Sequence, residues 1–134
     1  MNPPKVKLHP REFSSYCSLI ANSVNLLAEL ISADPFRTEY HRNFACLQDL
    51  HRKNAIQLAR LAHTYRRMVT VSLSHDTAFA LMESTLPSQN NRYLENLSGE
   101  IKKQIHDYYY KSVEGDLVMF ARCITNSQTK LIAQ

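Results

Sequence analysis

The chain has 134 residues, of which 44% are hydrophobic and 21% are charged, and this composition excludes an intrinsically disordered protein. The length suits one compact unit, so we expect a single helical-bundle domain over residues 1–134. Only two glycines and five prolines interrupt the chain, which favours long helices, and the net charge of +4 permits anionic partners without requiring them.

The first nine residues predict an extended basic arm, because they combine prolines with the cations Lys5 and Lys7. They contain no apolar run of signal-peptide length, and the longest apolar run, at residues 117–121, is too short to span a bilayer. The cysteines Cys17, Cys46 and Cys123 show no C-x-x-C spacing, which fits thiols in a reducing compartment. We therefore expect a soluble, cytoplasmic protein that makes no membrane contact.

A long helix with two apolar stripes is predicted after Pro10, a residue that suits the first turn of a helix. Spacings of four and three residues define the first stripe: Phe13, Cys17, Ile20, Val24, Leu27 and Ile31. A second stripe lies roughly 100° around the helix: Leu19, Leu26 and Leu30. The second stripe can meet another helix or another subunit, so we expect a homo-oligomer.

The sequence ADPF at residues 33–36 predicts the start of a second helix, with Asp34 as its cap and Pro35 in its first turn. We expect this helix to reach Met68 or Thr70. Its inward apolar positions are expected at Phe36, Tyr40, Phe44, Leu47, Leu58, Leu61 and Tyr65. Asn54 falls near the centre of this apolar arc with His51 at its edge; such a layer either sets helix register or satisfies a local polar group.

The sequence VTVSLS at residues 69–74 alternates β-branched and polar residues, as a strand does. A single strand would have no partner in a helical protein, so we interpret this stretch as the end of a helix. A short third helix follows in this interpretation. Ser74 or Asp76 would cap it, and Phe79 and Met82 would face inward.

The remaining sequence predicts a loop at TLPSQNN and then two more helices. The first has the apolar positions Leu94, Leu97, Ile101, Ile105 and Tyr108, and directs Tyr110 toward water. The second, capped by Ser112 or Asp116, has the stripe Val113, Leu117, Phe120, Ile124 and Leu131. The predicted fold is therefore all-α, an antiparallel up-and-down helical bundle of four main helices plus one short helix.

The strongest charge feature is HRKNAIQLARLAHTYRRM, residues 51–68, which contains five lysines and arginines and no acid. On one helix its basic side chains fall within an arc of roughly 140°, and Arg42 extends the same side. This predicted nucleic-acid or partner-binding face consists of Arg42, Arg52, Lys53, Arg60, His63, Arg66 and Arg67. It suits phosphate contacts of low sequence specificity, because no base-reading motif is present. The alternative is a solvated face whose cations pair with carboxylates such as Glu95 and Glu100.

Two His-Asp doublets, His75-Asp76 and His106-Asp107, offer an enzymatic alternative. Such a doublet resembles that of helical metal-dependent phosphohydrolases of the HD type, although Thr77 stands where that family usually has glycine. A phosphoacceptor helix would need a polar residue where Phe79 stands. The alternative function is therefore a small helical metal-dependent phosphohydrolase or phosphotransfer module centred on His75 and Asp76.

Taken together, these patterns favour a small non-catalytic helical accessory or assembly protein. We expect it to bind nucleic-acid backbone or an acidic protein through the face from Arg42 to Arg67. We expect no cofactor and no metal ligands, because the glycines are isolated and the cysteines lie on or beside apolar stripes where a thiol stays protonated.

Overall fold

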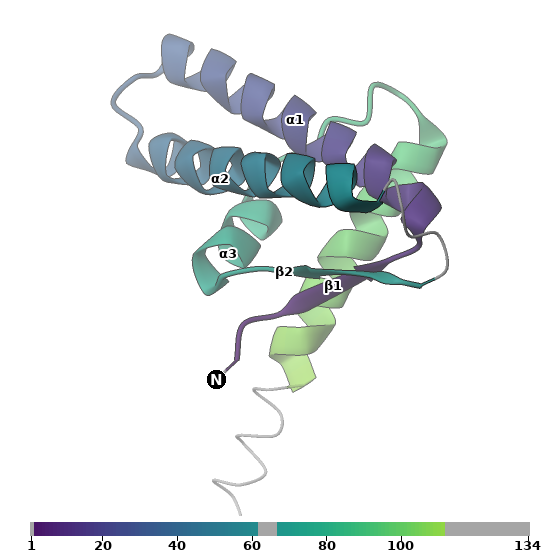
Figure 1. Cartoon of the computed structure of the whole chain (residues 1–134). Coiled ribbons are helices and arrows are strands. Elements are labelled where there is room, and N and C mark those ends of the chain that lie inside the picture. The colour runs from purple at the N-terminus through teal and green to yellow at the C-terminus, as the bar shows by residue number, and fades with distance from the viewer. Residues whose placement is uncertain (1, 62–66, 112–134) are drawn as a thin grey trace, which may run out of the picture.

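The computed structural model describes residues 2–61 and 67–111, and it is mostly helical with one small sheet (Figure 1). The elements in chain order are β1 (Lys5–Leu8), α1 (Pro10–Ala33), α2 (Thr38–Leu61), β2 (Val69–Ser72), α3 (His75–Glu83) and a helix over residues 92–111. The helical character that the composition predicted is confirmed, whereas the sheet was not predicted.

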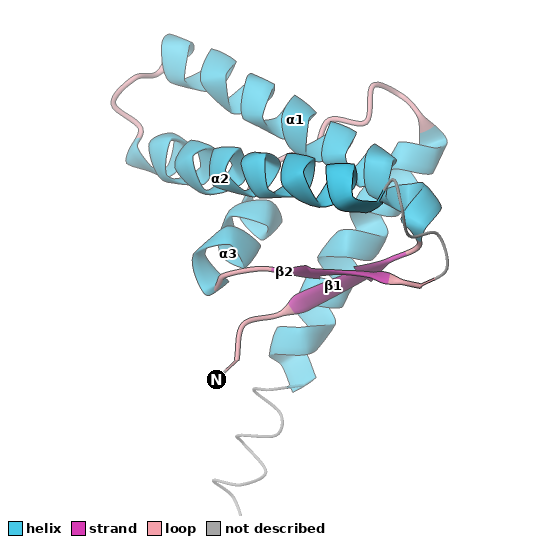
Figure 2. Cartoon of the chain, viewed as in Figure 1, coloured by secondary structure: helices cyan, strands magenta, loops and turns pink. Residues whose placement is uncertain are grey.

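The sheet joins the N-terminal arm to the middle of the chain (Figure 2). β1 and β2 pair antiparallel, with Val6 opposite Val71 and Lys7 opposite Thr70. Alternate side chains are buried against the helices, while Lys5, Lys7 and Thr70 face solvent. The interpretation of residues 69–74 as a helix end is therefore wrong. The strand that seemed to lack a partner pairs with the extended arm, which is an ordered strand rather than a free tail.

α1 begins at Pro10 as predicted, and His9 caps it. The His9 ring accepts from the Arg11 amide, and the Glu12 carboxylate accepts from the His9 amide, so the two residues form a reciprocal cap. The buried side of α1 consists of Phe13, Tyr16, Leu19, Ile20, Ser23 and Leu27. By length and mean hydropathy alone α1 could cross a bilayer, a property that the core helices of soluble proteins share.

The boundary between α1 and α2 differs from the prediction. Asp34 does not cap α2; it ends α1, and its amide donates to the Leu30 carbonyl at 2.9 Å. α2 (Thr38–Leu61) then begins at Thr38, and it does not reach Met68 as predicted, because Arg67 and Met68 are not helical. Phe36 lies in the turn and is 92% exposed, so its predicted inward position is wrong.

The inward side of α2 also follows a different line from the predicted one. Spacings of four and three residues connect its buried and half-buried positions: Asn43, Leu47, Leu50, Asn54, Gln57 and Leu61. Leu58 lies off this line and is 39% exposed, contrary to prediction. Tyr40 and Phe44 pack against the core as predicted. Tyr65 lies outside the described residues.

The arrangement of the helices is not the predicted up-and-down bundle (Figure 1). α1 and α2 run antiparallel side by side, whereas the helix over residues 92–111 crosses them steeply, and α3 packs beneath α2. Leu97, Ile101 and Ile105 are buried and Leu94 packs against them, which confirms the predicted seam of the 92–111 helix. The predicted last helix, from Ser112 or Asp116 onward, lies outside the described residues.

Candidate functional site

The cations predicted as one helical stripe are divided between two segments by the structure. α2 carries Arg42, Arg52, Lys53 and Arg60 and is described as far as Leu61, whereas Arg67 and Met68, just before β2, are not helical. Arg67 is exposed and lies in a bend before β2. His63 and Arg66 lie outside the described residues. A continuous basic helix reaching Met68 is therefore not what forms.

Two of the α2 cations are used in ion pairs. The Arg42 guanidinium donates to the Glu83 carboxylate at 3.0 Å and so connects α2 to the end of α3. Lys53 pairs with Asp49 one turn earlier at 3.0 Å. Glu95 and Glu100, the carboxylates suggested by the sequence, instead accept from Ser88 and Gln104.

Arg52, Arg60 and Arg67 are exposed and form no ion pair with any other residue that the structure describes. Pairing with neighbouring carboxylates thus accounts for Arg42 and Lys53 but not for these three. An exposed guanidinium keeps its five donors available for a planar anion such as phosphate. The most available cations of the predicted face are therefore the arginines near the end of α2 and the start of β2.

The sheet brings the cations of the arm to the same part of the molecule. The Gln57 side chain on α2 donates to the Thr70 carbonyl on β2 at 3.4 Å. Thr70 lies opposite Lys7 in the sheet, one strand spacing of roughly 4.8 Å away. Gln57 itself lies one turn after Lys53 and nearly one turn before Arg60.

We call the exposed cations of the sheet, of the second half of α2 and of the bend before β2 the basic surface: Lys5, Lys7, Arg52, Lys53, Arg60 and Arg67. A shallow cavity of about 480 Å³ lies along the last described turns of α2, where Lys53, Ile56, Gln57, Arg60 and Leu61 line it. Ile56 is 57% exposed at this place. The basic surface therefore combines spaced positive charges with a small apolar floor.

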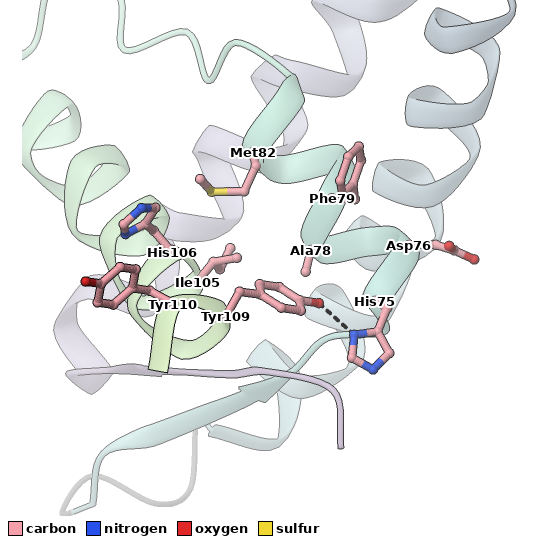
Figure 3. A pocket seen from close by; sticks show the side chains of 9 residues that line it. All are labelled: His75, Asp76, Ala78, Phe79, Met82, Ile105, His106, Tyr109 and Tyr110. Carbon is pink, nitrogen blue, oxygen red and sulfur yellow. Dashed lines mark hydrogen bonds between the residues drawn. The ribbon is translucent and has the colours of Figure 1, made fainter. Parts of the chain in front are cut away.

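A second hollow, which we call the α3 groove, lies between α3 and the last turns of the 92–111 helix (Figure 3). Its volume is about 630 Å³. It is lined by His75, Asp76, Ala78, Phe79, Met82, Ile105, His106, Tyr109 and Tyr110. Phe79 is 66% exposed and Met82 is 38% exposed, so their predicted inward positions are wrong. Ser74 caps α3 as predicted, and the buried positions of α3 are instead Thr77, Ala78, Ala80 and Leu81.

The packing of these two helices brings His75, Asp76 and His106 to the α3 groove, whereas Asp107 does not line it. His75 Nδ1 lies 2.7 Å from the Tyr109 hydroxyl, and the His106 ring stacks on Tyr110 with centroids 6.1 Å apart. The Asp76 carboxylate, however, points away from the groove (Figure 3). Within residues 2–61 and 67–111, no three histidine, cysteine or acidic side chains converge as a metal site. The described residues therefore do not assemble the ligand set that a metal-dependent phosphohydrolase needs.

The two described cysteines are not disulfide-bonded, and both are half-buried. Burial raises the pKa of the Cys17 thiol to about 11. Burial also raises the pKa of Cys46, and the Asp76 carboxylate adds to that effect. Cys17 and Cys46 therefore stay protonated at neutral pH, as the sequence predicted, and neither resembles an activated nucleophile.

Alkylation should show this protection directly. At pH 8.5 we expect Cys17 in the folded protein to react with iodoacetamide roughly 100-fold more slowly than in the unfolded chain, because only its thiolate is nucleophilic. Mass spectrometry of the separated peptides follows each cysteine individually, and the same reaction in denaturant supplies the reference rate. Equal rates for Cys17 in the folded and unfolded chains would contradict the burial of its thiol.

No protein-family model, no curated protein and no solved structure matches this chain. The basic surface and the α3 groove are therefore the features from which a function can be inferred.

Proposed function

We propose that this protein is a non-catalytic binding protein that holds a nucleic-acid backbone on the basic surface. The observation that carries the proposal is the exposure of Arg52 and Arg60 on one helix without an ion pair to any described residue. The contact between Gln57 and Thr70 supports it further, because it holds β2 against α2 next to Lys53 and Arg60, with Lys7 on the neighbouring strand β1.

The spacing of these charges suits a polyphosphate. Arg52 and Arg60 are eight residues apart, about 12 Å along a helix, which corresponds to the axial rise of three to four base pairs. Arginines on a rigid helix favour bidentate contacts with phosphate oxygens, and such contacts fix position without reading sequence. We therefore expect affinity that depends steeply on salt and weakly on base sequence.

Fluorescence anisotropy with labelled single-stranded and duplex oligonucleotides across a salt series tests the proposal. The variant Arg52→Glu/Arg60→Glu should weaken binding at least tenfold at low salt. It should also flatten the slope of log K against log salt by roughly 0.9 for each duplex phosphate that the variant no longer neutralises.

The matched control is Arg37→Glu/Arg92→Glu, which changes the net charge equally at the α1–α2 turn and at the start of the 92–111 helix. It should retain most of the affinity. If both double variants weaken binding equally, net charge rather than the basic surface is responsible. If the unchanged protein binds neither oligonucleotide at low salt, the nucleic-acid proposal is wrong, and an acidic protein becomes the partner to test on the same variants.

The remaining expectations stay predictions. Self-association through the second stripe of α1 stays a prediction: Leu19 is buried within the chain and Leu30 packs against the core, while Leu26 is half-buried. A cytoplasmic location stays the expectation from the sequence. The enzymatic alternative at His75 and Asp76 gains no support from the described side chains, since Asp76 points away from the groove that holds both histidines (Figure 3).

A further inference from the structure

We propose that the α3 groove is the docking site for residues 117–131 of the same chain, whose apolar stripe covers Phe79 and Met82. This inference uses none of the residues of the basic surface, so it can be tested independently of the proposed function. Three features support it: the character of the groove, the point where the chain leaves it, and the sequence that follows.

The α3 groove exposes several large apolar side chains together. Phe79, Met82 and Tyr110 all line it and all are exposed, while Ile105 forms part of its buried floor. In Figure 3 Phe79 and Met82 come from α3 and Tyr110 from the facing helix. Clustered apolar exposure of this kind marks an interaction site, because leaving it in water forfeits the free energy of burial.

The chain continues directly from the wall of this groove. Tyr109 and Tyr110 line it, and Lys111, the last described residue, follows directly on the same helix. Residues 112–134, which lie outside the described part, are therefore tethered at the groove itself. The sequence places Gly115 soon after this point, where a residue without a Cβ allows the chain to reverse.

The sequence of this segment has the pattern and length that the groove requires. Leu117, Phe120, Ile124 and Leu131 are spaced by three, four and seven residues, so they would lie on one side of a helix that begins after Gly115, with Arg122 opposite. From residue 117 to residue 124 such a stripe is about 11 Å long, and the nine residues of α3 span about 13 Å.

Tethering favours this segment over a second copy as the occupant. A segment joined to the groove by a short connection has an effective concentration in the millimolar range. A second copy would lose translational and rotational freedom on binding, a cost that the tethered segment avoids.

Disulfide trapping tests the proposal on the full-length chain. The native cysteines are first replaced in Cys17→Ala, Cys46→Ala and Cys123→Ala, and the pair Phe79→Cys/Phe120→Cys is then introduced. We expect an intrachain disulfide, seen in monomeric protein on a non-reducing gel and assigned by peptide mass spectrometry. A second pair, Met82→Cys/Ile124→Cys, guards against a single badly placed pair, and circular dichroism verifies that each variant is folded.

The control pair is Tyr93→Cys/Phe120→Cys. Tyr93 is an exposed aromatic residue on the same helix as Tyr109, but about 24 Å from it along the helix axis. The groove pairs should form the intrachain disulfide at least tenfold faster than this control. Disulfides that form only between chains at micromolar concentration would show that a second copy covers the groove and would overturn the proposal. Groove pairs that oxidise no faster than the control would overturn it as well.

Discussion

Replacing Val6 with aspartate is expected to lower the free energy of unfolding by more than about 3 kcal/mol, because it buries a carboxylate without a partner. Val6 is 1% exposed and lies opposite Val71 in the sheet, packed within the hydrophobic core. Urea denaturation followed by circular dichroism gives the difference between the variant and the unchanged protein.

The matched control is Lys5→Asp on the same strand. Lys5 is exposed and lies opposite Ser72, so a new carboxylate there remains in water and should change stability by only about 0.5 kcal/mol. Similar small effects for Val6→Asp and Lys5→Asp would indicate an arm that does not pack on the core, and would contradict the pairing of β1 with β2.

The elements that could be predicted are those that depend on one segment of the chain. α1 and the 92–111 helix follow from periodic apolar residues within one segment, so Pro10, Leu97 and Ile101 were placed correctly. The pairing of β1 with β2 joins segments more than 60 residues apart, and no local pattern reports it. The alternation in KVKL, residues 5–8, has the same period as that of VTVS, and this shared period is the signal that could have identified the partner.

The candidate sites divide in the same way. The identities of Arg52 and Arg60 were predicted, since charge and helical spacing are local. The departure from helix before Arg67 was not, because β2 starts at Val69 and its partner β1 is distant in the sequence. The α3 groove depends on the packing of two helices, so neither the exposure of Phe79 nor the approach of His75 to Tyr109 could be inferred from sequence.

The burial of Asn54 was predicted from the sequence, but its proximity to Tyr16 was not. Asn54 and Tyr16 are both almost completely buried. The Asn54 amide lies close enough to the Tyr16 hydroxyl to lower the pKa of Tyr16. The stronger effect is burial, which raises the pKa of Tyr16 well above its usual value. Neither the Tyr16 hydroxyl nor Asn54 Nδ2 reaches hydrogen-bonding geometry with another described group.

Substitutions at Tyr16 should therefore distinguish the contribution of its ring to stability from the contribution of its hydroxyl. Tyr16→Ala is expected to lower the free energy of unfolding by about 4 kcal/mol, because it removes a large buried ring that packs against Phe13. Tyr16→Phe keeps the ring and removes a buried hydroxyl that lacks a well-formed hydrogen bond. It should leave stability at pH 7 unchanged or raise it by about 1 kcal/mol. A decrease of more than about 1 kcal/mol in Tyr16→Phe would show instead that the hydroxyl is well bonded in solution.

The pH dependence of stability above pH 10 provides a second, independent comparison of the unchanged protein with Tyr16→Phe. The raised pKa means that the folded state holds the Tyr16 proton where the unfolded chain releases it. Its contribution to stability is complete below the unfolded pKa of about 10 and is lost as pH rises above it, by up to about 1.4 kcal/mol per pH unit. Tyr16→Phe has no such proton, so its stability should fall less steeply between pH 10 and 11. Because the Cys17 thiol titrates in both proteins, the difference between their slopes belongs to Tyr16, and parallel curves would contradict its burial between α1 and α2.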